Sequence, residues 1–289
     1  MHAADTAAVA WWIWPIALFV ATFALGIVAV LSGVGGGVLF VPIVGSFFPF
    51  HLDFVRGTGL LLALAGALSA APSLLASGLA SLRLAMPFAL LGSTASIFGA
   101  LLGLALPAAL MQALLGATIL AIAALIGRST RSEYPLVAAP DRLAAALRLN
   151  GLFHDPVDSR EVRWQTHRTP AGLVLFAGIG LLAGMFGLGA GWANVPVLNL
   201  VLGAPLKVSV ATSGVVLSVV DTSAAWVYLH SGAVLPLIAV PSIVGVMLGA
   251  KIGARLLRVA RASTVRKLVI TLLVVAGTRA LLKGTGLWN

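Results

Sequence analysis

The chain contains no cysteine and very few charged residues. Without cysteine it can form neither a disulfide framework nor a thiolate or cysteine-ligated metal site. Charged residues make up 9% of its 289 residues, whereas soluble domains carry about 25%. Hydrophobic residues make up 60%, and a chain this apolar cannot cover its surface with polar side chains in water. The composition predicts an all-α polytopic membrane protein, and the lipid bilayer is its expected partner.

Acidic residues are scarcer than basic ones, with 8 against 18, so the net charge is +10. A basic balance can indicate nucleic-acid binding, but here the basic residues cluster beside apolar runs, as in the loops of membrane proteins. We therefore expect no nucleic-acid partner. The first apolar run has no lysine or arginine before it, so it lacks the n-region of a signal peptide. Trp11, Trp12 and Trp14 are interpreted as an interfacial belt on a retained helix.

Eight long apolar runs are present, and a membrane-spanning helix needs about 20 such residues. They cover 11–49, 54–79, 83–106, 108–127, 170–205, 206–230, 233–254 and 266–283. The polar stretch 128–169 separates the first four from the last four and holds seven arginines. We interpret it as a connecting loop with a short amphipathic helix over 141–149. The predicted organisation is a first repeat over 1–127, this loop, and a second repeat over 170–289.

Two of these runs are interrupted by glycines. Run 11–49 contains Gly33, Gly35, Gly36 and Gly37, and run 170–205 contains Gly187, Gly189 and Gly191. Several glycines within five residues unwind a helix, because glycine loses the most backbone freedom on folding. Each break is followed by a short apolar segment with a proline, Pro42 or Pro196. Each long run is therefore predicted to be a helical hairpin with one arm, a glycine tip and a shorter arm.

The two glycine tips belong to an internal repeat with a constant offset of 154 residues. Gly33 aligns with Gly187, Pro42 with Pro196 and Thr58 with Thr212, without a gap. Apolar composition favours chance matches of alanine and leucine, but it does not explain aligned glycine, proline, serine and threonine. The chain is therefore predicted to be a duplication whose halves are joined by the polar loop.

The orientation of the two halves follows from the basic residues. Short basic loops stay in the cytoplasm, so the loop 128–169 is expected inside. Arg255, Arg258, Arg261, Arg266 and Lys267, between the last two runs, belong on the same side. A hairpin adds no net crossing, so each half crosses an odd number of times and both termini lie outside. This predicts inverted repeats, an architecture found in secondary transporters, whereas a parallel duplication of plain spans is the alternative.

The glycine tips are predicted to form a binding site. Non-helical backbone inside a membrane is tolerated only where it is buried in protein or lines a polar cavity. In an inverted pair the two tips approach from opposite faces and can meet near the midplane. A helix begins after each tip, near Val38 and near Trp192, and its unpaired N–H groups suit an anion. The alternative is that the glycines only allow tight helix packing.

Polar side chains within the runs complete the predicted site. Candidates for substrate contact are Thr58, Asn194, Ser209, Thr212 and Ser213, besides the glycines of both tips. For the hydroxyl groups, bonding to carbonyls of their own helix is the alternative. Asp221 is the only acidic residue in the middle of a run and is the candidate for coupling transport to a proton, with a hydrogen-bonded packing role as the alternative. Asn199 is expected to face the same cavity, and His230 to lie at the membrane interface.

The doubled motif resembles a known family. Gly33-Val-Gly-Gly-Gly with Val41-Pro42, and Gly187-Leu-Gly-Ala-Gly with Val195-Pro196 and Ala211-Thr212-Ser213, are similar to the sulfite exporter TauE/SafE family of bacterial membrane transporters. The resemblance covers nearly the whole chain except the loop. The first half departs from it, with Arg56-Gly57-Thr58-Gly59 in place of Ala-Thr-Ser. The resemblance implies transport of a small sulfur-containing anion, such as sulfite or a sulfonate, across the bacterial inner membrane.

Three function classes remain. The leading one is a secondary transporter for a small anion that works by alternating access of the two halves. An anion channel shares the same sequence features. An intramembrane enzyme is disfavoured, since the chain has no HExxH, GxSxG or metal-ligand spacing, and without GxxxxGK[ST] nothing indicates ATP coupling. We expect no enzyme activity, no metal and no cofactor. The anion, the direction, the coupling ion and the oligomeric state stay open, with a homodimer as one option.

Overall fold

The computed structural model describes residues 12–32, 36–76, 78–128, 135, 137, 139–155, 160–256 and 262–286. Within them the chain is overwhelmingly helical, which confirms the all-α polytopic class predicted from composition. The helices of the first half are α1 (Ile13–Ser32), α2 (Gly36–Phe47), α3 (Leu52–Ala76), α4 (Leu82–Ala105) and α5 (Ala108–Arg128). The second half contains α7 (Thr169–Phe186), α8 (Gly191–Pro196), the π-helix η1 (Val197–Val201), α9 (Leu206–His230), α10 (Pro236–Leu256) and α11 (Ala262–Gly284).

Four helices, α4, α5, α7 and α9, are long and apolar enough to cross a membrane, judged on the described residues. Shorter apolar segments lie in α1, α2 and α10. Large apolar side chains remain on the outside of the protein, and Phe98 and Val174 are 67% and 72% exposed. An apolar outer surface of this kind is unfavourable in water and suits contact with lipid.

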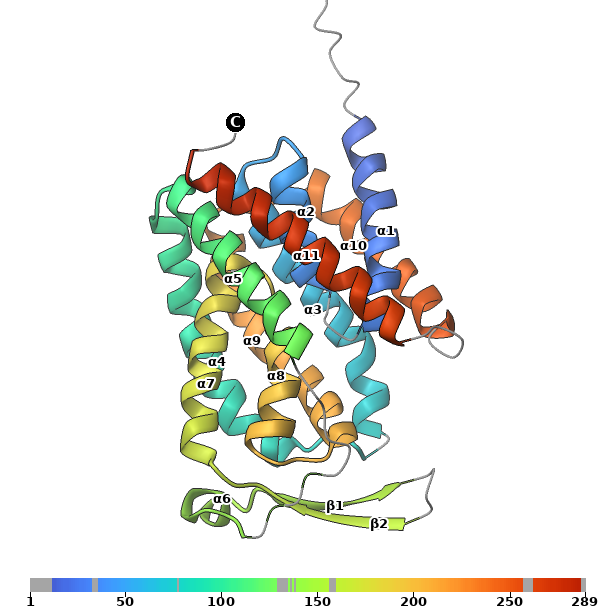
Figure 1. Ribbon diagram of the computed structural model, residues 1–289, viewed down its shortest axis with the longest axis vertical. Coiled ribbons are helices and arrows are strands. Elements are labelled where there is room, and N and C mark those ends of the chain that lie inside the picture. Colours follow the sequence, from blue (N-terminus) through green and yellow to red (C-terminus); the bar gives the residue numbers. More distant parts are fainter. Residues whose placement is uncertain are drawn as a thin grey trace, which may run out of the picture.

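The principal packing partners come from opposite halves of the chain (Figure 1). Helix α1 packs on α10 and α4 on α7, while α5 lies along α11 and α3 along α9. By the offset of 154 residues, α1 corresponds to α7 and α10 corresponds to α4. The α1–α10 pair is therefore the counterpart of the α7–α4 pair. In Figure 1, α1 descends from the top of the view, whereas α7 rises from the bottom. Inverted repeats are expected to pack in this way, and the inverted relation itself stays a prediction.

One close helix contact occurs in both halves at corresponding residues. Gly26 of α1 lies against α10, where an added Cβ would sit 2.6 Å from the Val246 carbonyl oxygen. Gly180 of α7 makes the matching approach to the Gly92 carbonyl of α4. The two glycines are 154 positions apart, and so are Gly92 and Val246. The sequence repeat is therefore also a repeat of contacts, of the close kind that small residues permit between membrane helices.

The polar stretch between the halves contains a β-hairpin that the sequence analysis did not predict. Strand β1 (Asn150–Asp155) pairs antiparallel with β2 (Arg160–Gln165), and Asn150 lies opposite Gln165. The helix expected over 141–149 is present as α6 (Arg142–Ala146). The hairpin was not predicted because each strand is only six residues long, and in β2 only Val162 and Trp164 alternate with polar neighbours. So short an alternation is a weak strand signal.

Asp141 fastens this loop to the helices of the second half. Its carboxylate accepts hydrogen bonds from the N–H groups of Ala144 in α6 and Thr169 at the start of α7. Partial desolvation raises the pKa of Asp141, but these two donors and the nearby His167 outweigh that effect. The pKa of Asp141 therefore lies below its ordinary value, and the ionised carboxylate joins α6 to α7.

Candidate functional site

The two glycine tips contact each other in a buried part of the protein. Gly37, near the start of α2, faces the second tip: a Cβ added there would lie 2.6 Å from the Leu188 carbonyl oxygen and 2.9 Å from that of Gly59. Both Gly37 and Leu188 are buried. Gly36 begins α2, whereas Gly33 and Gly35 lie outside the described residues. The described part of the first tip thus touches the second tip.

The second tip takes its shape from two glycines in the left-handed region. Gly187 ends α7 with a φ of 69°, and Gly189 follows with a φ of 70°. A residue with a Cβ is strained in this region. At Gly187 an added Cβ would also overlap the Arg56 carbonyl of α3. Gly191 then begins α8, which continues directly into η1.

Helices α3 and α9 flank the tips. Gly59 of α3 lies against Gly187, because a Cβ added at Gly59 would be 2.5 Å from the Gly187 carbonyl oxygen. At Gly189 an added Cβ would lie 2.7 Å from Cβ of Ala63 in α3 and 3.1 Å from Oδ2 of Asp221 in α9. Since α3 and α9 come from different halves and pack on each other, the tips meet where the two halves of the chain join.

Three fully buried side chains on the elements around the tips have no hydrogen-bond partner of ordinary geometry among the described residues. They are Thr58 on α3, Asn194 on α8 and Asp221 on α9, and the unpartnered atoms are one hydroxyl, both amide atoms and both carboxylate oxygens. Each such group costs about 1–3 kcal/mol when it is buried without a partner. Single hydroxyls of this kind occur elsewhere, at Ser93 and Ser242. Buried polar groups that lack a protein partner indicate that a polar ligand, an ion or water supplies one.

Of the three groups, the Asp221 carboxyl costs the most free energy to bury, because it carries a charge when it is ionised. It is fully buried, and its carboxyl group faces the backbone of Gly189. No ion pair of Asp221 is present among the described residues, and a buried ionised carboxylate without a cation is strongly unfavourable, so the group has to be protonated or balanced by a cation. The corresponding residue of the first repeat is Ala67, which makes the tip region asymmetric.

Arg56 lies beside the second tip and holds the end of α7. Its Nη1 donates to the Met185 carbonyl oxygen at 3.0 Å, and its Nη2 pairs with Asp53. The guanidinium lies 5.8 Å from the ring centroid of Tyr228, whose hydroxyl donates to the Gly184 carbonyl. The last carbonyls of a helix lack partners within it and carry partial negative charge. Arg56 and Tyr228 therefore stabilise the end of α7 just before the tip.

The other predicted site residues lie near the start of α9. Thr212 Oγ1 accepts a hydrogen bond of 3.1 Å from the N–H of Ser81, the residue just before α4. The Ser209 hydroxyl and the Asn199 amide both donate to the Ala204 carbonyl, so Asn199 contacts the chain that leads into α9. Ser213 is also buried. At a rise of about 1.5 Å per residue, the segment 209–213 lies about 12–18 Å along α9 before Asp221.

The remaining polar residue named from the sequence is His230. His230 is exposed at the end of α9 and stacks on Trp226, as expected for the end of a span. The described residues hold no group of three or more histidine or acidic side chains that could bind a metal ion. The chemistry at the tips therefore depends on hydroxyl, amide, carboxyl and backbone groups.

Comparisons with known proteins agree with the motif resemblance. The model of the family described as "Sulfite exporter TauE/SafE" matches residues 18–280. Over 127 residues the chain is 28% identical to "Probable membrane transporter protein YunE" of Bacillus subtilis (strain 168), a match that covers 44% of this chain and 46% of that protein. The aligned part thus spans about half the length of this relative. No solved structure matches the chain.

Proposed function

The chain belongs to the sulfite exporter TauE/SafE family, and on that premise we propose that it is a secondary transporter that carries a small anion across a bacterial inner membrane. Its membership of a family of membrane transporters supports the transport role. The proposed substrate is a sulfur oxyanion or a sulfonate. The two halves would form inverted repeats and expose the site alternately to either side.

The unpartnered polar groups around the glycine tips carry this proposal. Thr58 and Asn194 are fully buried, and neither side chain has a partner among the described residues. A hydroxyl and an amide can each donate to the oxygens of sulfite or a sulfonate. The start of α2 at Gly36 adds backbone N–H groups at the first tip, where the helix dipole favours an anion. The glycines let the backbone approach the ligand closely.

Asp221 gives the proposed site a reason to couple transport to a proton. An anion next to an ionised carboxylate would be repelled by about 4 kcal/mol at about 4 Å in a medium with an effective dielectric constant of about 20. Asp221 lies against Gly189 of the second tip, so its charge has to be neutralised when an anion binds there. Protonation of the carboxyl group does this, and the proton would then move together with the anion.

The proposal is tested by removing the donor groups of the two side chains. We expect Thr58→Val and Asn194→Ala to raise the KM for sulfite or methanesulfonate uptake into proteoliposomes about tenfold or more, because a hydrogen bond to a charged group contributes about 1.5–3 kcal/mol. Thr22→Val is the matched control, since the Thr22 hydroxyl is buried but bonded to the Leu18 carbonyl of its own helix. The control variant should transport normally.

Two results would contradict the proposal. Unchanged KM values in both tip variants, with the melting temperature also unchanged, would place the anion elsewhere. Flux that neither saturates nor shows counterflow would make the protein a channel instead of a carrier.

A further inference from the structure

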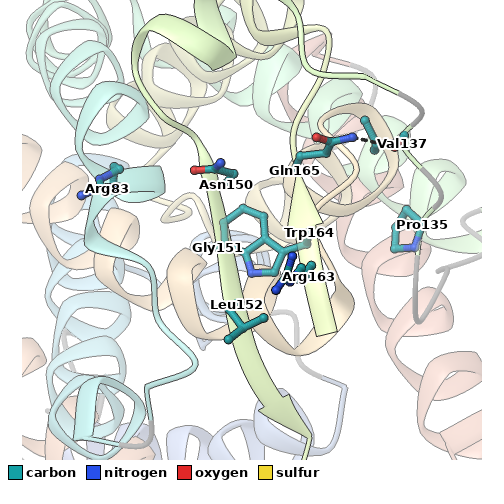
Figure 2. A pocket seen from close by; sticks show the side chains of 9 residues that line it. All are labelled: Arg83, Pro135, Val137, Asn150, Gly151, Leu152, Arg163, Trp164 and Gln165. Atoms are coloured by element: carbon teal, nitrogen blue, oxygen red, sulfur yellow. Dashed lines mark hydrogen bonds between the residues drawn. The ribbon is translucent and has the colours of Figure 1, made fainter. Parts of the chain in front are cut away.

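A cavity of about 730 Å³ lies at the loop end of the protein, away from the glycine tips. It opens between the β-hairpin and the start of α4, with Arg83 on the α4 side and Arg163, Trp164 and Gln165 from β2 on the other (Figure 2). Asn150 of β1 also lines it. Its volume falls within the range of about 300–1,000 Å³ that is usual for small-molecule sites. A cavity of this size at an ordered hairpin can hold a ligand.

The polar lining of this cavity is basic and lacks charge partners. Arg83 and Arg163 take part in no ion pair within the described part of the chain, and no acidic residue lines the cavity. Gln165 uses its amide on the Val137 carbonyl, which holds one edge of the cavity in place. Two arginines thus line one cavity that no acidic residue lines, and such a lining attracts an anion from outside the chain.

The wall between the two arginines is rigid and partly apolar. Trp164 is 8% exposed, and its ring lies against Gly151 of β1, where an added Cβ would sit 2.7 Å from the ring. The side chain of Trp164 is therefore fixed by packing, while Arg163 next to it is exposed. A lining that combines a fixed aromatic ring with two arginines suits a tetrahedral anion that carries an organic part.

We propose that this cavity binds a phosphate group, presented either by a soluble phosphorylated compound or by the headgroup of an anionic lipid. Arginine matches phosphate through paired N–H donors, which favours Arg83 and Arg163 as its ligands. Because Arg83 stands on α4 and Arg163 on the hairpin, a bound phosphate joins the two. This site is independent of the transport site proposed at the tips.

Hydrogen bonds connect the segments near the cavity to the membrane helices. The Ser81 N–H, just before α4, donates to Thr212 of α9, and Asp141 joins α6 to the start of α7. A phosphate that clamps the hairpin to α4 therefore holds the loop against the ends of α4, α7 and α9. We expect slower backbone amide exchange in 150–153 and 162–165 when the site is filled, because these segments line the cavity or adjoin its lining.

The test uses the full chain in nanodiscs and two separate probes. Inorganic phosphate is titrated in phosphatidylcholine nanodiscs, with chloride at equal ionic strength as the reference. The second arm compares phosphatidylcholine nanodiscs with and without phosphatidylglycerol, by melting temperature and by amide exchange. Saturable phosphate binding in the first arm identifies a soluble ligand, and an effect confined to the second arm identifies the lipid headgroup.

The double variant Arg83→Gln/Arg163→Gln should weaken binding about tenfold or more in the arm that shows an effect, since each charged hydrogen bond contributes about 1.5–3 kcal/mol. Arg142→Gln is the matched control, because Arg142 lies in the same loop, is exposed and does not line the cavity. The proposal is overturned if neither arm shows a specific effect. It is equally overturned if Arg142→Gln weakens binding as much as the double variant, since binding would then reflect only the net charge of the loop.

Discussion

Asp221 is a buried carboxyl group whose charge has to be neutralised if the proposed anion binds at the tips. It contacts the second tip at Gly189 and has no cationic partner in the described part of the chain. We predict that Asp221→Asn abolishes the stimulation of uptake by a pH gradient in proteoliposomes, because an amide cannot carry the proton. Exchange of substrate across the membrane without a gradient should persist, since an amide is neutral like a protonated carboxyl group.

The matched control for Asp221 is Glu161→Gln. It makes the same chemical change at an exposed position of the β-hairpin, outside the helices. This control should respond to a pH gradient like the unchanged protein. Equal stimulation of Asp221→Asn and the unchanged protein would remove the carboxyl group from coupling.

The contact that Arg56 makes with the end of α7 could not be predicted from the sequence. It appeared there only as a departure from the Ala-Thr-Ser of the second half. In the structure it is buried and bonded to the Met185 carbonyl, 129 residues away. The unusual presence of an arginine at the edge of an apolar run was the one available signal. Its partner depends on how α3 packs against the end of α7, which no local pattern encodes.

At the level of elements, the two hairpins follow the glycine pattern closely. Helix α1 ends at Ser32 and α2 begins at Gly36, while α7 ends at Phe186 and α8 begins at Gly191. These breaks were predictable because several glycines together weaken a helix wherever they occur. The continuation of α8 as the π-helix η1 and the β-hairpin of the loop carried no comparable local signal.

The contact between α6 and α7 should depend on pH through Asp141. Because its pKa is lowered in the folded protein from the ordinary 3.8, the ionised carboxylate stabilises the contact fully above that value. The stabilisation is lost as the pH falls through the lower, folded-state pKa. We predict faster intrinsic-rate-corrected amide exchange in 142–146 at such pH values. Asp141→Asn should weaken the contact by about 1 kcal/mol at neutral pH, as loss of a helix cap does.

The same pH series on the Asp141→Asn variant provides the control. Its exchange in 142–146 should no longer change through the pH window in which the unchanged protein responds. A pH response that persists in this variant would assign the titration to another group.

At the level of the whole molecule, the predicted orientation can be tested directly because the chain contains no cysteine. We predict that Pro140→Cys, in the loop, reacts with a membrane-impermeant maleimide only after the cells are opened. Thr285→Cys, beyond α11, should react in intact cells, because the C-terminus is predicted outside. Both positions are exposed, so access to the reagent depends on the side of the membrane.

The paired labelling also discriminates between the two repeat models. Labelling of position 140 from outside intact cells would contradict the cytoplasmic loop. Labelling of both positions from the same side would contradict an odd number of crossings in the second half, and with it the inverted repeats.

The sequence by itself determined the membrane class, the two glycine breaks and the repeat with its offset of 154 residues. These properties depend on composition and on local backbone preferences, which act wherever the residues stand. Only the tertiary structure decided which polar groups near the tips keep no partner. Ser209, Thr212 and Asn199 bond to backbone, whereas the side chains of Thr58 and Asn194 keep no partner among the described residues. Partners of buried groups are set by helices that pack from distant parts of the chain, so the composition of the site follows from packing.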